Sequence, residues 1–193
     1  MKKGSSASQY AILGFLGFGP MSGYDIKQTV ERSVRHFWNE SYGQIYPLLK
    51  RMSAEGLAVA KTERNHGKPD RKVYSITPKG KKQLQDWLAH PAKAQPSRNE
   101  LLLKIFFSGK ENSANDLRQL ERTRAEHAAL LSEYLNIESD LRHRRAPHPQ
   151  LPYWLMTLDF GKRRSQAIVD WCDQSIKTLR HLSSKSPNKK RRN

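Results

Sequence analysis

The chain has 193 residues, of which 36% are hydrophobic and 27% charged, so it can form one or two small globular domains. Its 35 lysine and arginine residues exceed its 18 acidic residues, and the formal net charge of +17 indicates a polyanionic partner, with nucleic acid as the leading candidate. The single cysteine, Cys172, excludes an intramolecular disulfide and a cysteine-rich zinc site and fits a reducing cytoplasm.

The first two helices are predicted between residues 10 and 37. Tyr10–Leu16 is apolar enough for a short, mostly buried helix, which GFGP ends. Ser22 and Asp25 in SGYD predict a capping-box-like start for the second helix, with the acid at its positive end. The core stripe of this helix is expected at Ile26, Val30, Val34 and Phe37, which recur at helical spacing. The start of the chain superficially resembles a secretory leader, but glycines interrupt it and no small-residue cleavage site follows.

Residues 41–58, SYGQIYPLLKRMSAEGLA, predict a third helix with two different faces. One face is apolar and consists of Ile45, Leu48, Leu49 and Met52. Pro47 cannot donate a hydrogen bond to the carbonyl of Gly43, so the helix either starts near Gly43 or bends there. Gly56 is placed to end it.

The opposite face of the third helix carries hydrogen-bonding and positive groups, which suit an anionic partner. We predict DNA contacts from Ser41, Tyr42, Gln44, Tyr46, Pro47, Lys50 and Arg51. Gln44 can read adenine through two hydrogen bonds, and Lys50 can reach guanine or a phosphate. Tyr46 and Pro47 offer apolar contacts to a thymine methyl group. Tyr46 lies at the boundary of the two faces, so a place in the core or on a phosphate is the alternative.

A β-hairpin is predicted after the third helix. LAVAKTER and KVYSIT alternate as strands do, and the turn-rich NHGKPD separates them. The tip of the hairpin is surrounded by Lys61, Arg64, His66, Lys68, Arg71 and Lys72. Thr77 and Pro78 then predict the start of a fourth helix. Three helices followed by a hairpin is the order of a winged helix, whose third helix enters the major groove while the basic wing follows the phosphate backbone.

The second half of the chain is predicted to be helical. ELLLKIFFSG is a short apolar helix, residues 112–145 contain neither proline nor glycine, and residues 153–182 supply another long helix. Long helices with narrow apolar seams bury little by themselves, so we expect them to pair with a second subunit. The predicted dimerisation residues are Leu102, Leu103, Ile105, Phe106, Phe107, Trp154, Leu155, Leu158, Phe160 and Trp171.

The expected fold class is mainly α with a small β-hairpin. An N-terminal winged helix (residues 1–89) precedes a linker (90–99), a helical dimerisation domain (100–184) and a basic disordered tail (185–193). Two prolines among small polar residues indicate the linker. Only five of the 35 basic residues lie in the tail, so the charge excess belongs to the whole chain. No stretch approaches the ~20 apolar residues of a membrane span, and we expect a cytoplasmic protein with no membrane partner.

No residue pattern predicts a catalytic, metal or cofactor site. His143 and His148 are five residues apart across a proline without a carboxylate or thiol beside them, which favours a cationic surface over a metal site. Cys172 is expected to be a packing thiol. The helical core, or alternatively an effector cavity, is expected to include Trp154, Met156, Phe160 and Trp171. Because no catalytic triad, paired carboxylates or P-loop occurs, we predict no enzymatic activity.

Several of these stretches resemble the PadR family of bacterial winged-helix transcriptional regulators. YAILGFLGFGPMSGYDI is similar to the first helix of that family and its turn, GQIYPLLKRMSAEGL to its recognition helix, and GKPDRKVYSITPKGKKQL to its wing. ELLLKIFFSG and LDFGKRRSQAIVDW resemble the larger C-terminal domain of one subfamily, so the resemblance covers residues 8–182. It implies a homodimer, usually a repressor of a neighbouring gene, that binds double-stranded DNA at an inverted-repeat operator.

The leading hypothesis is therefore a sequence-specific DNA-binding regulator. A winged-helix adaptor that binds protein is one alternative, but it would expose apolar side chains where this helix has Gln44 and Lys50. A general nucleoid or RNA-binding protein is the other, since the charge of +17 permits it. The sequence does not determine whether a small-molecule effector exists or which molecule it is. It also does not determine the operator or the choice between repression and activation.

Overall fold

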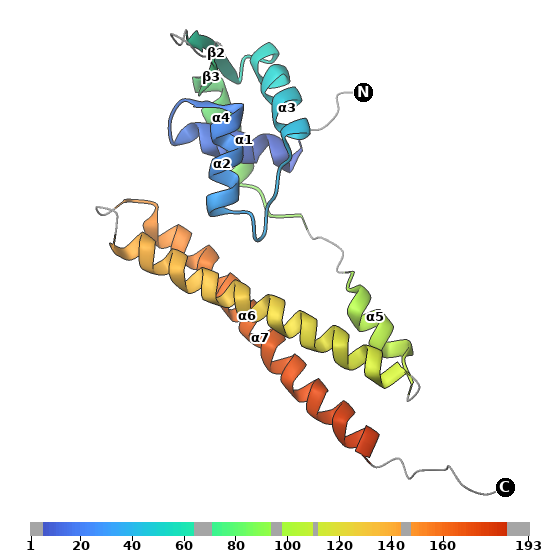
Figure 1. Cartoon of the computed structure of the whole chain (residues 1–193). Helices are drawn as coiled ribbons and strands as arrows, with labels where there is room; N and C mark the ends of the chain where they lie inside the picture. Colours follow the sequence, from blue (N-terminus) through green and yellow to red (C-terminus); the bar gives the residue numbers. More distant parts are fainter. Residues whose placement is uncertain (1–5, 64–70, 94–97, 110–111, 144–147, 185–193) are drawn as a thin grey trace, which may run out of the picture. The chain divides into compact units, whose positions relative to one another are not determined.

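The computed structural model describes residues 6–63, 71–93, 98–109, 112–143 and 148–184. The chain divides into two compact units, Met1–Gln95 and Pro96–Asn193. The first unit contains α1 (Ala7–Gly17), β1 (Met21–Ser22), α2 (Gly23–Ser33), α3 (Tyr42–Ala54), β2 (Ala58–Glu63), β3 (Arg71–Ile76) and α4 (Pro78–Leu88). The second contains α5 (Glu100–Phe107), α6 (Ser113–His143) and α7 (Leu151–Ser184) (Figure 1). The expected mainly α-helical protein with a small β-structure is confirmed.

The core of the first unit is formed by α1, α2, α3 and the sheet. Its buried apolar residues are Ile12, Leu13, Phe15, Leu16, Ile26, Val30, Ile45, Leu49, Met52, Leu57, Ala58 and Tyr74. The three that α3 contributes have no solvent exposure. Burying an apolar side chain of this size stabilises the fold by about 1.5–3 kcal/mol. This inner face holds α3 on the unit and leaves its opposite face turned outward.

The sheet has three antiparallel strands in the order β1-β3-β2, where the sequence predicted a two-stranded hairpin. β2 and β3 pair from Ala58 opposite Ile76 to Glu63 opposite Arg71. β1 adds Met21 opposite Tyr74 and Ser22 opposite Val73. The chain leaves α1 through Gly19, whose φ of 148° suits glycine, and then runs extended along the open edge of β3. A strand of two residues has no periodicity of its own, so the sequence did not reveal it.

α2 begins as predicted but ends earlier. The Ser22 hydroxyl accepts a hydrogen bond from the Asp25 amide, and the Ser22 amide donates to the Asp25 carboxylate, which completes the expected capping box. The helix ends at Ser33, so the prediction that Phe37 lies in its core stripe is wrong: Phe37 is 55% exposed. Helical spacing stops applying once the chain leaves the helix at Val34, which still packs against the core.

Pro47 lies in the second turn of α3, five residues after the helix starts at Tyr42. Gly43, whose carbonyl the proline leaves without a helical donor, is exposed and open to water. Gly56 ends the helix as predicted, with a φ of 70°. The amide of Gly56 donates to the carbonyl of Ser53, and that of Leu57 to the carbonyl of Met52, which is the Schellman arrangement.

The start of α4 lies against the chain that leaves α3. The Thr77 hydroxyl accepts a hydrogen bond from the Gly80 amide and lies 2.8 Å from the Gly56 carbonyl oxygen. The Thr77 amide donates to the carbonyl of Leu57 at 3.1 Å. A Cβ atom at Gly80 would lie 2.2 Å from that carbonyl oxygen, so only glycine allows this approach. Farther along α4, Trp87 stacks on Tyr10 of α1 with ring centroids 4.8 Å apart.

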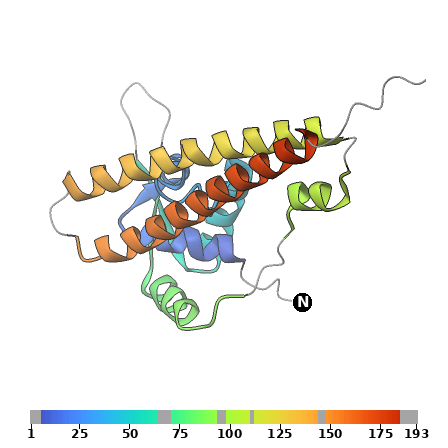
Figure 2. The ribbon, with the colours of Figure 1, turned by 90° about the horizontal axis from the view of Figure 1, so that it is seen from below.

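The second unit is an antiparallel pair of long helices, α6 and α7, with α5 against one end (Figures 1 and 2). Its central cluster consists of Leu120, Cys172 and Ile176, with Ile105 of α5 packed against it. Ion pairs join α6 to α7, including Arg124 with Asp173 at 2.6 Å and Glu121 with Arg180 at 2.9 Å. The Tyr134 ring lies over Gly161, where a Cβ atom would come within 2.7 Å of it. Among the described residues, no helix combines the length and apolar character that crossing a membrane requires.

The glycine at position 80 provides a test of the corner between α3 and α4. Gly80→Ala should lower the free energy of unfolding by about 1–3 kcal/mol, because the added methyl group meets backbone, which cannot rotate away. Gly14→Ala is the matched control, since a Cβ atom at Gly14 in α1 meets nothing within 4 Å and alanine favours the helix. Denaturant unfolding of both variants measures the difference in stability. Equal stability would show that the backbone at this corner moves to accommodate the added methyl group.

Candidate nucleic-acid interface

The outer face of α3 is exposed where the sequence predicted it. The exposed residues are Ser41, Tyr42, Gln44, Tyr46, Pro47 and Lys50. The Gln44 side chain also holds the start of the helix: its Oε1 accepts hydrogen bonds from the Ser41 amide at 2.9 Å and from the Ser41 hydroxyl at 3.0 Å. The remaining amide group, Nε2, is the part of Gln44 that this cap does not use.

Arg51 is less exposed than the other residues predicted for that outer face. It is half-buried, and its Nη2 donates to Oε1 of Gln9 at 2.7 Å, while Gln9 itself is only 1% exposed in α1. Its Nε lies 3.8 Å from the Glu55 carboxylate. The guanidinium therefore ties α3 to α1. Helical periodicity could not show that α1 partly covers it, and a contact between Arg51 and DNA stays a prediction.

Three exposed tyrosines form a row beside the outer face of α3. The Tyr24 and Tyr42 rings stack with centroids 6.4 Å apart, and those of Tyr42 and Tyr46 with centroids 6.3 Å apart. The three side chains are 55%, 41% and 50% exposed, respectively, so Tyr46 is not a core residue. Tyr46 lies against Gly23, where a Cβ atom would come within 2.7 Å of the ring. Sequence patterns did not place Tyr24 in this row, because only folding brings α2 beside α3.

The pKa of the Tyr42 phenol is raised from its ordinary value. Partial desolvation raises it, and neighbouring Tyr24 and Glu31 add to the effect. A tyrosine already carries its proton at physiological pH, and this shift moves ionisation further away, so the Tyr42 hydroxyl can donate to a phosphate oxygen.

The described part of the wing carries exposed cations on both strands. Lys61 lies on β2 and Lys72 on β3, where Lys72 is opposite Thr62. Arg71 instead forms an ion pair with the Asp25 carboxylate of α2. That pair anchors the first residue of β3, at the turn end of the wing, to the capping box of α2, so Arg71 has a structural partner. Arg64, His66 and Lys68, also predicted for the wing, lie outside the described residues.

The stability that this ion pair contributes depends on pH, because the Asp25 carboxylate must be ionised. Its burial by itself would raise the pKa of Asp25, but hydrogen bonds from Ser22 and the ion pair with Arg71 outweigh burial and lower the pKa below 3.8. A carboxylate with a lowered pKa stabilises the folded state wherever it is ionised in both states, that is, above its ordinary pKa.

The second unit exposes apolar side chains on α5 and on the first part of α7. On α5, Leu102, Leu103, Phe106 and Phe107 are 48%, 58%, 79% and 75% exposed. On α7, the exposed residues are Tyr153, Met156 and Phe160. The predicted dimerisation residues Ile105, Leu158 and Trp171 instead pack within the chain, and Leu155 is half-buried. Trp154 stacks on His148 with ring centroids 4.6 Å apart.

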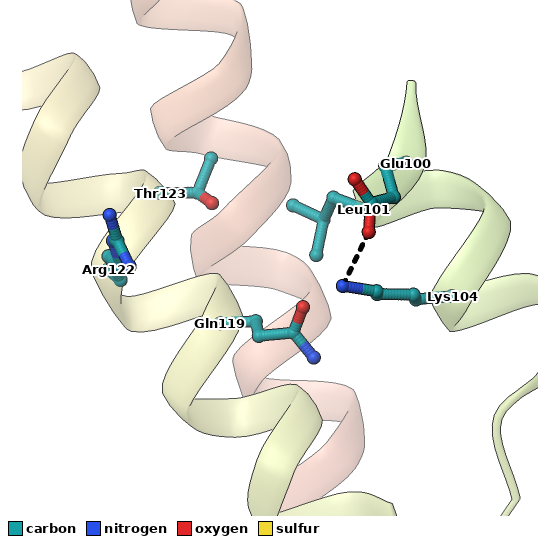
Figure 3. A pocket seen from close by; sticks show the side chains of 6 residues that line it. All are labelled: Glu100, Leu101, Lys104, Gln119, Arg122 and Thr123. Atoms are coloured by element: carbon teal, nitrogen blue, oxygen red, sulfur yellow. Dashed lines mark ion pairs between the residues drawn. The ribbon is translucent and has the colours of Figure 1, made fainter. Parts of the chain in front are cut away.

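Two hollows in the described part of the second unit lie between α5 and α6. One of about 210 Å³ is lined by Glu100, Leu101, Lys104, Gln119, Arg122 and Thr123 (Figure 3). Lys104 pairs with Glu100 at 2.7 Å, and Arg122 with Glu126 at 2.8 Å. A neighbouring hollow has Leu103 and Phe107 in its wall. Neither involves the tryptophans that the sequence suggested for an effector cavity.

Neither cysteine nor histidine forms a reactive centre in the described structure. Cys172 is fully buried as a packing thiol, and burial, followed by the nearby Asp173, raises its pKa. Within the described ranges, no group of three His, Cys, Asp or Glu side chains could hold a metal ion. In the described part of the first unit, the exposed outer face of α3 and the cationic strands beside it are the features suited to an anionic partner.

Comparison with known proteins gives matches for both units. Residues 12–86 match the transcriptional regulator PadR-like family, and residues 97–180 match the virulence activator alpha C-terminal family. A relative from Bacillus subtilis, described as the negative transcriptional regulator PadR, is 31% identical over 173 residues, which cover 87% of this chain and 94% of the relative.

Two solved structures of Bacillus subtilis PadR are similar to the whole fold. The complex with operator DNA has a TM-score of 0.79 and 27% identity, covering 91% of this chain and 98% of the other. The complex with p-coumaric acid has a TM-score of 0.68 and 27% identity, covering 89% and 94%.

The lowered pKa of Asp25 predicts an acid-sensitive contribution to stability. Asp25→Asn should cost about 1 kcal/mol at neutral pH, because a partly exposed charged hydrogen bond is lost. As the pH falls from 3.8 through the lower folded-state pKa, the wild-type protein should lose this advantage and the two proteins should converge. Unfolding at a series of pH values measures this, with Asp86→Asn, an exposed acid of α4, as the control. A difference that does not change with pH would exclude an ionised Asp25 as its source.

Proposed function

Because the chain belongs to the PadR-like family of transcriptional regulators, which are not enzymes, we propose that it acts as a homodimeric repressor at an inverted-repeat operator. The observation that carries this proposal is the exposed, polar outer face of α3, held outward by three fully buried apolar residues on its inner face. The similarity to a structure solved with operator DNA supports it.

In the proposed complex, α3 enters the major groove with Gln44 and Lys50 toward the base edges and Pro47 between them. The row of Tyr24, Tyr42 and Tyr46 then faces the backbone beside the groove, where tyrosine hydroxyls can donate to phosphate oxygens. Lys61 and Lys72 of the wing reach the adjacent phosphates. Two such units related by a twofold axis would read two half-sites of a palindrome.

The proposed dimer is held by the second unit. Four large apolar side chains of α5 lie about half-exposed or more, which is costly for a surface that stays in water. The exposed apolar residues at the start of α7 lie at the other end of the helical pair and form a separate apolar surface. A second copy of the chain would bury the same residues on both partners, as a twofold interface requires.

Repression by promoter occlusion is the simplest mechanism for such a dimer, in the cytoplasm, where the promoter lies. The description of the Bacillus subtilis relative as a negative regulator supports this direction. We also propose that a small molecule controls binding, since that relative has been solved with p-coumaric acid. A ligand in the hollow of Figure 3 would contact α5, the same helix that carries the proposed dimer surface.

Selection of bound duplexes from a random library tests the proposal directly. The full chain should enrich a palindrome whose half-sites are about one helical turn apart, or a multiple of that distance. The competing function is general nucleic-acid binding, which the net charge of +17 favours. Enrichment of no sequence, with equal binding to random duplexes, would replace the proposed function with that alternative.

Phe106 provides a test of the dimer surface. Phe106→Asp should weaken self-association at least about tenfold, because a carboxylate would have to be desolvated at the interface. Phe37→Asp serves as the control, since Phe37 is also exposed but lies in the first unit. Analytical ultracentrifugation of the full chain over a concentration series compares the variants. A Phe106→Asp protein that dimerises as tightly as the wild type would place the interface elsewhere.

A further inference from the structure

We infer that Gln44 selects guanine at one operator position and not adenine, because its amide oxygen is used within the protein and only its amide NH2 group is presented to DNA. This inference rests on the proposed function, in which α3 occupies the major groove. It also replaces the expectation that Gln44 reads adenine.

The orientation of the Gln44 amide follows from its partner. The Ser41 backbone N–H can only donate, so the atom 2.9 Å away must be the amide oxygen of Gln44. The Ser41 hydroxyl lies 3.0 Å from the same oxygen. Ser41 precedes the first turn of α3, where its amide has no helical acceptor. Turning the amide group over would point Nε2 at this donor, so the helix start fixes which end of Gln44 faces outward.

The chemistry of the base edges then determines the preference. Glutamine recognises adenine by accepting from N6 and donating to N7, which needs both ends of the amide. Guanine offers two acceptors, N7 and O6, to a donor, whereas thymine offers one and cytosine presents a donor. The two hydrogens of Nε2 therefore match guanine best. Lys50, on the same exposed face, also carries donors only, so both side chains favour acceptor-rich edges.

Three substitutions of Gln44 separate the role of its oxygen from that of its NH2 group. Gln44→Ala removes both. Gln44→Glu keeps an oxygen for Ser41, and with it the S-x-x-E form of the capping box, but presents only acceptors to DNA. Gln44→Lys presents only donors and loses the cap. The readout is the affinity of the full chain for its selected operator with each of the four base pairs placed in turn at every half-site position.

The wild-type protein should prefer guanine over adenine about 5- to 150-fold at the position whose preference Gln44→Ala abolishes. Gln44→Lys should keep the preference for guanine. Gln44→Glu should lose that preference and favour cytosine or adenine, whose amino groups donate. The melting temperature of Gln44→Glu should stay at or above that of the wild type. The thermal measurement shows that this variant folds, so the change in base preference cannot come from a damaged helix.

Other outcomes overturn the inference in distinguishable ways. If the position that depends on Gln44 prefers adenine, the amide turns over on binding, and the inference fails while the proposed function stands. If Gln44→Ala leaves every base preference unchanged, Gln44 reads nothing, and again only the inference fails. A wild-type protein without any base preference would remove the proposed function and the inference with it.

Discussion

The backbone contact between Leu57 and the start of α4 sets the geometry of the first unit. The Leu57 carbonyl accepts the Thr77 amide, and the backbone at Gly80 passes so close that no side chain fits there. Leu57 joins the end of α3 to β2, and Thr77 joins β3 to α4. The wing therefore begins (β2) and ends (β3) at one corner, which also ends α3. Because this corner is made of backbone, it fixes where the wing leaves α3.

Local signals in the sequence predicted most of this fold. The caps at Ser22 and Thr77 and the helix end at Gly56 each depend on residues within a few positions of one another, and each is found as expected. What the sequence missed depends on contacts between distant segments. Arg51 bonds to Gln9 and Arg71 to Asp25, across 42 and 46 residues, and β1 exists only because β3 has an open edge. Periodicity reports which way a side chain faces, but not which element covers it.

These distant contacts also change how the charge of +17 should be interpreted. Arg51 and Arg71 hold the first unit together, and Arg124 and Arg180 join α6 to α7. Each exposed pair adds little to stability, but a cation with a partner inside the fold is less available to DNA. Among the described residues, the proposed binding surface is therefore narrower than the composition suggests: it includes the exposed part of α3, the tyrosines beside it, and Lys61 and Lys72 of the wing.

The two units divide the task of recognition in the proposed complex. The first unit determines which bases are read, because α3 and its cap fix the donors that face the groove. Self-association is proposed for the second unit. Ile105 fixes α5 to the pair of long helices, while Phe106 and Phe107 on the same helix are exposed to solvent. If a second copy covers those rings, the packing of α5 on the long helices positions the dimer surface. Changes in that surface would then weaken dimerisation without altering the half-site sequence that α3 reads.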